Sequence, residues 1–498
     1  MTILAQQKND PVILTAIVLL IGGLFGVSLA EPLVIPWALA LLPIIVLLAY
    51  WVVRWDVMVL SWIWLISYGC LDFDELKIEV PGMLMMSPPR LLFIAASGVY
   101  LLYFLRRGSL RFDRKVLWLF LALVLYLGWS ANNSGWVSDI DKFKNAPIYR
   151  YFEAFLLPFI MLVLVYNVVR SSKQAAWPFV LMSILGWYVL YVGFLQFAYG
   201  AGMHWANSLI FPQYIVAAND AIDLERARGP FRGAGMQSMF LVALFYMNMY
   251  SIRRIRGGYR VALALQIVLI PLGIFFTGVR AGYVAFFLCG IVWFLWGHRY
   301  RAGRLKLAVA TMVLLIGTLI FWDNLSDVDR RGGGVAQTGP MYARWVLAAQ
   351  AYEILQDHPW FGVGFGHFID YQVQMPRDPQ SLAGLPLDMV AQHNVFLTVL
   401  SEAGLIGLFG LLALLIAVFR ESTSLYRKIP IGATGWVSRE LVVAFWIIML
   451  NYIVCGMFRD TFWEIPGCVL LWSMAGLIVG YNRLLEPHQI DPTNGSHN

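Results

Sequence analysis

Two arginines in this chain stand where a short polar turn joins apolar stretches. Arg228 lies in RARGPFRGAG, directly before an apolar stretch that begins near residue 234, and Arg280 lies in TGVRAG, between two such stretches. A guanidinium group at that depth is costly unless it pairs or lines a watery cavity. Its planar fork donates two parallel hydrogen bonds to a phosphate group and stays charged. Arg228 and Arg280 are therefore the main candidate ligands for an anion.

Three further arginines have an ordinary alternative explanation. Arg226 and Arg232 belong to the same RARGPFRGAG segment, but snorkelling to lipid headgroups, or a salt bridge such as that of Arg226 with Glu225 or Asp223, also accounts for them. Arg344 lies in the first turn of a predicted surface helix, where a plain surface charge is the alternative to anion binding. We keep all three as candidate contacts to a phosphate or a sugar.

His393 is the candidate for proton transfer. It precedes Asn394 at the point where a long polar segment gives way to an apolar stretch, so both are expected at a helix N-terminus, with its N–H donors and positive dipole end. A histidine there acts as a general base toward a hydroxyl or donates to a phosphate oxygen, and capping is the alternative. Glu402, in the same apolar stretch, either orients a ligand or holds two helices together.

A glycine-rich turn precedes this histidine. Gly362, Gly364 and Gly366 in GVGFGHF do not follow the G-x-G-x-x-G pattern, and no strand comes before them, so dinucleotide binding is excluded. Glycines so closely spaced permit close backbone approach to a helix or to a ligand. His358 and His367 flank the turn and are predicted to be hydrogen-bonded structural residues.

The elements that position these residues are membrane helices. With 60% hydrophobic and 13% charged residues, the chain cannot hide its apolar surface inside a water-soluble globule. A bilayer span needs roughly 20 apolar residues, which predicts an all-α polytopic protein with about 12 to 14 spans. The candidate spans cover residues 12–30, 34–53, 56–70, 90–105, 116–131, 151–168, 177–199, 234–251, 259–276, 280–297, 306–322, 392–419, 440–457 and 465–482.

The chain is predicted to form a single transmembrane domain over residues 1–485, followed by a polar tail over residues 486–498. Residues 28–30 resemble a signal-peptidase site, but further spans follow at once, so the first helix is expected to be retained. The four cysteines form no C-x-x-C pair and are predicted to be core residues without a metal or redox role; they are Cys70, Cys289, Cys455 and Cys468.

The distribution of Lys and Arg predicts the orientation. These residues collect in four predicted connections, at 106–115, 253–260, 299–306 and 420–439. Positive charge near span ends is retained in the cytoplasm, so these connections and both termini are expected to face inward. The segments expected to face outward are residues 71–89, 132–150, 200–233, 277–281, 323–391 and 458–464.

The large outward loop, residues 323–391, is predicted to contain an amphipathic helix on the membrane domain's outer surface. Thr338-Gly339-Pro340 is a credible helix start, and the helix is expected to extend from about residue 340 to Asp357. The residues at helical spacing along it are Tyr342, Trp345, Val346, Ala349 and Tyr352 or Glu353.

Taken together, the motifs resemble those of the bacterial O-antigen ligase and O-antigen polymerase superfamily over roughly residues 200 to 420. The residues that carry the resemblance are Arg228-Gly229-Pro230-Phe231, Thr277-Gly278-Val279-Arg280, the segment His358 to Gly366, and His393-Asn394 followed by Gly404 and Gly407. The resemblance implies an all-α lipid-sugar glycosyltransferase fold and a transferase for undecaprenyl diphosphate-linked glycans at the periplasmic face of the bacterial inner membrane. It implies no metal, no other cofactor and no nucleic acid partner.

In that family the functional core is an arginine ahead of a central span, an arginine at a helix turn and the histidine of the H-N pair, which fall here on Arg228, Arg280 and His393. Arg226 and Arg232 compete with Arg228 for the first place. The implied leaving group is a lipid diphosphate, whose growing charge fixed guanidinium groups stabilise as a divalent metal does elsewhere. Direct displacement by an acceptor hydroxyl then inverts the anomeric centre.

Three functions remain open at this point. The extra N-terminal helices and the long outer loop favour a polymerase that joins repeat units of O-antigen or exopolysaccharide, whereas a ligase would transfer the glycan to lipid A-core. Both need a lipid-linked donor and an acceptor glycan within the membrane lipids. A transporter for lipid-linked sugars is the rival from another class, but the sequence has no matched pair of Gly- or Pro-broken helices typical of such proteins.

Overall fold

The structure is a computed structural model, and it describes residues 58, 62, 64–66, 87–107, 110–138, 146–209, 226–231, 233–297, 338–375, 392–459 and 465–486. Throughout these ranges the regular structure is helical, and no strand occurs in them. Seven of the helices in this part are long and apolar enough to cross a membrane. The prediction of an all-α, multi-pass membrane protein is therefore confirmed.

The helices coincide within a few residues with the predicted spans that fall in the described ranges, except that the helix beginning at Val395 continues to Lys428, nine residues beyond the predicted end at residue 419. The spans expected at 12–30, 34–53 and 306–322, most of 56–70, and Cys70 lie outside them. The longer helices are α4 (Pro88–Arg107), α5 (Lys115–Ser134), α7 (Leu157–Val168), α8 (Ala176–Gly200), α9 (Ala234–Ser251), α10 (Gly258–Phe276), α11 (Arg280–Trp296), α14 (Thr338–Asp357), α16 (Val395–Lys428), α17 (Arg439–Phe458) and α18 (Ile465–Leu484). Short ones are α6 (Ala146–Arg150), a π-helical segment (Tyr151–Leu156) that leads into α7, and α15 (Phe368–Gln374).

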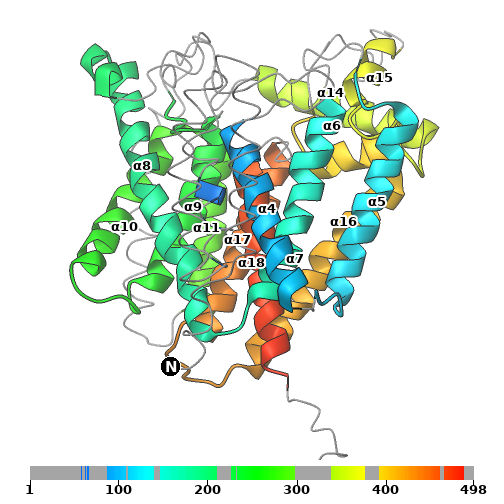
Figure 1. Cartoon of the computed structure of the whole chain (residues 1–498). Helices are drawn as coiled ribbons and strands as arrows, with labels where there is room; N and C mark the ends of the chain where they lie inside the picture. The colour runs from blue at the N-terminus through cyan, green and yellow to red at the C-terminus, as the bar shows by residue number, and fades with distance from the viewer. Residues whose placement is uncertain are drawn as a thin grey trace, which may run out of the picture.

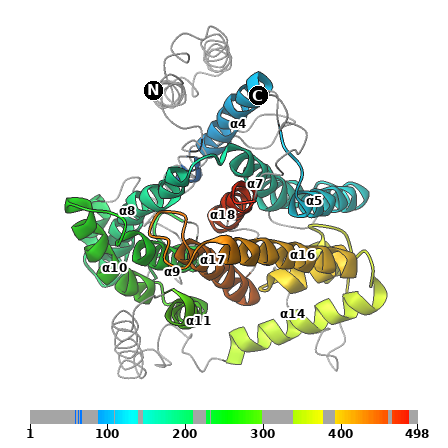
Figure 2. The same cartoon turned by 90° about the horizontal axis from the view of Figure 1, so that it is seen from below.

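Helix α18 forms the centre of the bundle, with α7, α16 and α17 around it (Figure 2). A Cβ at Gly476 would lie 2.6 Å from Leu162 O of α7, so the absence of a side chain allows the two helices to approach closely. Cys289, Cys455 and Cys468 are buried, as predicted for core cysteines. In general, a helix that is apolar on all sides packs in the interior of a bundle.

Helices α9 and α10 show the two environments that a membrane bundle offers. Every residue of α9 from Ala234 to Asn248 is buried, whereas α10 at the periphery exposes apolar side chains such as Val261 (71%) and Val268 (66%) (Figure 1). Apolar exposure of this extent is unfavourable in water and is normal against lipid tails. The side of α10 that carries these residues is therefore the lipid-facing side.

Helix α16 is broken at Gly404, whose φ of 64° is unfavourable for a residue with a side chain. A Cβ there would overlap the backbone of Trp360, and one at Gly362 would lie 2.5 Å from Ser401 O. The break frees backbone groups that the glycine-rich turn satisfies: Val363 N donates to Ser401 O at 2.9 Å, and Leu405 N donates to Pro359 O at 2.9 Å. The glycines thus permit backbone approach to a helix, one of the two roles predicted for them.

Helix α14 has the predicted bounds and lies along α16 at one end of the bundle (Figures 1 and 2). The residues predicted at helical spacing are only partly buried. Val346, Leu347 and Ile354 are buried, whereas Trp345 and Tyr352 are each 61% exposed. Leu347 and Ile354 form a small apolar cluster with Phe368 of α15, which leaves Trp345 and Tyr352 on the outer side of the helix.

Candidate functional site

Five basic residues from distant parts of the sequence gather at the end of the bundle that carries α14. Positive charges of Arg344 and Arg226 act on the guanidinium of Arg280, and those of Arg344 and Arg459 act on the imidazole of His393. Arg344 therefore links the two halves of one group. We call Arg226, Arg280, Arg344, His393 and Arg459 the basic cluster.

The segment that carries Arg226 and Arg228 is held by hydrogen bonds from two helices. Ala227 N donates to Phe276 O at the end of α10 (3.0 Å), which places the segment beside the turn that contains Arg280. Gln196 of α8 is buried, and its Oε1 accepts from Arg228 N at 2.9 Å and from Gly229 N at 2.8 Å. Arg226 is exposed and Arg228 is half-buried, and Arg232 lies outside the described residues.

Arg280 is the first residue of α11 and is exposed at the end of the bundle. The turn before it needs Gly278, whose φ is 63°, and Thr277 supports the turn by accepting from Val279 N at 3.3 Å. A Cβ on Gly282 would overlap the Ser238 hydroxyl of α9, so this glycine lets α11 pack closely against α9. The TGVRAG motif therefore fixes the place where the guanidinium group leaves the helix.

His393 is positioned by its two neighbours. Asn394 caps α16, since its Oδ1 accepts from Phe396 N at 2.9 Å and Leu397 N at 3.1 Å, and its Nδ2 donates to Met457 O of α17 at 3.1 Å. Gln392 Nε2 donates to Leu347 O of α14 at 2.8 Å. The expectation of free N–H donors at this helix start is corrected, because the Asn394 side chain takes up two of them.

His393 is exposed at the protein surface, but neighbouring protein atoms displace part of the water around its ring. This partial desolvation lowers the pKa of His393 below its ordinary value of 6.5, and the positive charges of Arg344 and Arg459 lower it further. At neutral pH the imidazole is therefore uncharged. A neutral imidazole accepts a proton on one nitrogen and donates from the other.

Arg459, directly after α17, was not among the candidates from the sequence. Its guanidinium lies over Gly235 at the start of α9, where any Cβ would overlap it. The signal that identifies this residue was present, because residues 458–464 were expected to be a short outward turn and an arginine there runs against the positive-inside tendency. The same criterion had selected Arg280.

Glu402 makes contacts with the protein itself. Its Oε1 accepts from Arg150 Nη1 at 2.6 Å, its Oε2 accepts from Gly366 N at 3.0 Å, and the side chains of Glu402 and Arg150 are 2% and 6% exposed. A buried carboxylate in such a pair holds α6, the glycine-rich turn and α16 together. Of the two roles expected for Glu402, these contacts favour holding helices together.

His367 is also a structural residue, as predicted. Its Nδ1 pairs with Asp370 Oδ2 at 2.6 Å and its Nε2 with Gly135 O at 2.8 Å. His358 is exposed and packs edge-on against Tyr371. Neither histidine contributes to the basic cluster through these contacts.

Two buried polar side chains of α9 lie next to the turns that carry the arginines. Gln237 and Ser238 are fully buried, and the Gln237 amide and the Ser238 hydroxyl have no hydrogen-bond partner among the described residues. Gln237 packs against Gly229, next to Arg228, and Ser238 packs against Gly282 of α11. Buried polar groups of this kind require a bound water or a ligand.

The basic cluster suits an anion better than it suits a metal. No salt bridge joins Arg226 or Arg344 to an acidic side chain within the part of the chain that the structure describes. In the same part, no group of three or more His, Cys, Asp or Glu side chains is placed to hold a metal ion. Guanidinium groups and a neutral histidine at one surface can bind a multiply charged phosphate and accept a proton beside it.

The comparison with protein families finds a similarity in the central part of the chain. The family described as O-Antigen ligase matches residues 261–412, which include Arg280, Arg344 and His393. The resemblance to the O-antigen ligase and polymerase superfamily is thereby confirmed over this segment. Arg226, Arg228 and Arg459 lie outside the matched residues. No curated protein matches the chain.

Proposed function

We propose that this chain, in which residues 261–412 match the O-Antigen ligase family, joins glycan repeat units at the outer face of the bacterial inner membrane. The match supports glycan transfer from a lipid-linked donor within a multi-pass membrane protein. The finer proposal is a polymerase of O-antigen or exopolysaccharide units with an undecaprenyl diphosphate-linked donor and an acceptor glycan. It works without a metal and inverts the anomeric centre.

The observation that carries the proposal is the basic cluster. Arg280, Arg226 and Arg344 place three permanent positive charges close together, and Arg459 adds a fourth beside His393. A diphosphate carries charge on two phosphates, so it gains from several guanidinium groups that are fixed before it arrives. Helix ends and backbone hydrogen bonds provide that fixation.

The chemical step assigns one role to each kind of group. The acceptor hydroxyl oxygen attacks the anomeric carbon of the donor, and the bond from that carbon to the diphosphate oxygen breaks. The electron pair of this bond leaves with undecaprenyl diphosphate, whose added charge Arg280 and its neighbouring arginines stabilise. The hydroxyl proton passes to a nitrogen of neutral His393, which acts as general base.

The other candidates receive more limited roles. Arg226, Arg228, Arg344 and Arg459 bind the phosphates or the sugar next to them, and Arg232 remains a proposed contact. Asn394 positions His393 through its cap and its bond to Met457 O. Glu402 secures the scaffold through Arg150. Gln237 and Ser238 form a polar floor for water or a substrate hydroxyl between the two arginine-bearing turns.

The orientation of the protein follows from its charges. The end with the basic cluster faces the periplasm together with the large loop, residues 323–391, and the polar tail after residue 485 faces the cytoplasm. The basic connections at the opposite ends of the helices support this arrangement, since positive charge is retained in the cytoplasm. The whole of residues 1–485 then forms one transmembrane domain.

Transfer to lipid A-core by a ligase is the second candidate, because both reactions use the same donor and differ in the acceptor. A flippase is less well supported. The backbone groups freed at the break in α16 are bonded by the protein's own turn, as Val363 N and Leu405 N show, whereas transporters use such groups to bind a substrate or ion.

One pair of experiments tests the proposal. Purified protein in detergent, given a lipid-linked repeat unit and excess chelator, is expected to yield longer lipid-linked glycans. A deletion strain is expected to display single repeat units on lipid carrier or core, whereas loss of a ligase leaves full-length chains on undecaprenyl diphosphate. Absence of any longer or transferred product, or a strict need for added metal, contradicts the proposed reaction.

A further inference from the structure

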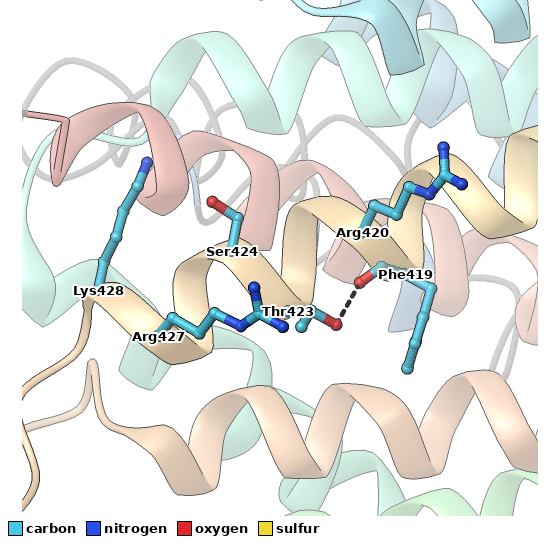
Figure 3. Close-up of a pocket in the computed structure, with 6 residues that line it drawn as sticks. All are labelled: Phe419, Arg420, Thr423, Ser424, Arg427 and Lys428. Carbon is cyan, nitrogen blue, oxygen red and sulfur yellow. Dashed lines mark hydrogen bonds between the residues drawn. The ribbon is translucent and has the colours of Figure 1, made fainter.

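A hollow in the described structure lies at the other end of α16 from His393. It measures about 550 Å³, within the roughly 300–1,000 Å³ of small-molecule sites, and α16 supplies its lining. The lining residues are Phe419, Arg420, Thr423, Ser424, Arg427 and Lys428 (Figure 3). We call this the lower hollow.

The lower hollow arises from two neighbouring rows of side chains on the surface of α16. Phe419, Thr423 and Arg427 form one row at four-residue spacing, and Arg420, Ser424 and Lys428 form the next. Each row has a short hydroxyl side chain at its middle and longer side chains at its ends, so the middle is low and the ends are raised (Figure 3). Thr423 Oγ1 donates to Phe419 O at 2.9 Å, which keeps this hydroxyl on the helix surface.

The ends of the lower hollow are cationic. No salt bridge joins Arg420 or Arg427 to an acidic group in the described ranges, and both side chains are exposed. Lys428 is partly neutralised, since its Nζ lies 3.3 Å from Glu486 Oε1. Basic residues in a last helical turn complement the helix dipole, but Arg420 lies two turns before the end of α16, where that effect has faded.

An exposed apolar stripe on the same helix leads into the lower hollow. Phe409 is 60% exposed, Ile416 is 51% exposed and Phe419 is 44% exposed. From Phe409 to Arg420 the helix rises about 16 Å, which is close to half of the roughly 30 Å hydrocarbon core of a bilayer. The stripe thus has the length of one leaflet and ends at the cationic groups.

We propose that the lower hollow and this stripe bind one anionic glycerophospholipid of the leaflet opposite the basic cluster. The phosphate lies between Arg420 and Arg427, and the acyl chains lie along Phe419, Ile416 and Phe409. A polar cluster alone would suit free phosphate equally well, but an apolar stripe of one leaflet's length suits a lipid only. Clusters of Lys and Arg at the cytoplasmic end of a membrane helix bind anionic headgroups in this way.

The test is native mass spectrometry of the full-length protein in detergent, titrated with phosphatidylglycerol, phosphatidylcholine or glycerol 3-phosphate. The double variant Arg420→Gln/Arg427→Gln is expected to weaken phosphatidylglycerol binding roughly 10- to 30-fold, because each basic residue contributes a step of about three- to fivefold. Phosphatidylcholine is expected to bind weakly to both proteins, and glycerol 3-phosphate is expected not to compete.

A matched control is Arg256→Gln/Arg260→Gln. Both arginines are exposed near the start of α10, and neighbouring Arg254 bonds to Gly435 O at 3.1 Å in the segment after α16, so the control removes the same charge at the same end of the bundle. It is expected to bind phosphatidylglycerol like the parent. Equal weakening in both double variants, equal binding of phosphatidylcholine, or effective competition by glycerol 3-phosphate would overturn the proposal.

Discussion

The two ends of α16 are both basic, yet they are built in different ways. At one end, His393 joins arginines from four other segments of the chain, and none of these residues lies within ten positions of it. At the other end, a single helix supplies Arg420 and, two turns later, the adjacent Arg427 and Lys428. The first group depends on the tertiary fold, whereas the second needs only a helix.

This difference separates chemistry from anchoring. Arginines held by distant elements keep fixed distances to one another, which is what stabilisation of a developing charge requires. Long side chains on one exposed helix face keep their rotamer freedom and adapt to mobile headgroups. Changes at the first end are therefore expected to alter catalysis, and changes at the second end to alter lipid binding.

The largest expected effect is on turnover at the basic cluster. Arg280→Gln removes the charge that Arg226 and Arg344 surround, and we expect glycan transfer to fall about 10²- to 10³-fold, as for loss of one fixed donor to a developing anion. Arg260→Gln, with the same charge change at the other end of the bundle, is expected to retain parental rates. The measurement is the initial rate of lipid-linked glycan elongation by purified protein. Equal rates for the two variants would mean that the two ends of α16 do not differ in their contribution to catalysis.

The next effect is on stability at the break in α16, which sets the direction of the helix between its ends. Gly404→Ala places a side chain at a φ of 64° and against the Trp360 backbone, and we expect it to lower the free energy of unfolding by at least about 2 kcal/mol. Gly435→Ala, where an added Cβ meets nothing within 4 Å, is the control. Thermal unfolding in detergent measures the stability of both variants. A Gly404→Ala protein as stable as the control would contradict the close packing of the glycine-rich turn against the break in α16.

A smaller effect is expected for the side chain that joins α16 to α17. Asn394→Ser keeps a capping oxygen but loses the donor to Met457 O, so we expect near-parental thermal stability and transfer reduced about tenfold, the worth of one hydrogen bond. Asn394→Ala loses the cap as well and is expected to lose about 1 kcal/mol of stability in addition. Full activity of Asn394→Ser would mean that the bond to α17 does not position His393.

The smallest effect is a displacement of the pH profile. Positive charge from Arg344 contributes to the lowered pKa of His393, so Arg344→Gln raises that pKa toward 6.5. A general base is active when deprotonated, and the acidic limb of the transfer rate is therefore expected to move to higher pH. Arg344→Lys keeps the charge and is expected to keep the parental limb. An unchanged limb in Arg344→Gln would argue against His393 as the base.

Local signals in the sequence predicted much of the fold. Apolar length located α5, α8 and α17, and Thr338 with Pro340 marked the start of α14. The sequence did not show which face of α14 packs against the protein, since the predicted stripe contains both Val346, which is buried, and Trp345, which is exposed. In a membrane protein, periodicity alone does not tell the side facing lipid or solvent from the side facing protein.

The candidate site was only partly accessible to the same reasoning. Arg280 and His393 stand out in the sequence because each breaks a local rule. In the structure the positive charge of Arg344 acts on both of them. The link from Glu402 to Arg150 and the place of Arg459 over Gly235 are long-range contacts, which no spacing in one segment can indicate. Only the tertiary packing of the chain brings these residues together.

Binding of the donor's diphosphate tests the central claim most directly. A short-chain polyprenyl diphosphate, titrated into purified protein in detergent with excess chelator, reports affinity without turnover. We expect Arg280→Gln/Arg459→Gln to weaken binding about 100-fold or more, and Arg420→Gln/Arg427→Gln to leave it unchanged. Parental affinity in the first double variant, or an equal loss in the second, would contradict the assignment of the diphosphate to the basic cluster.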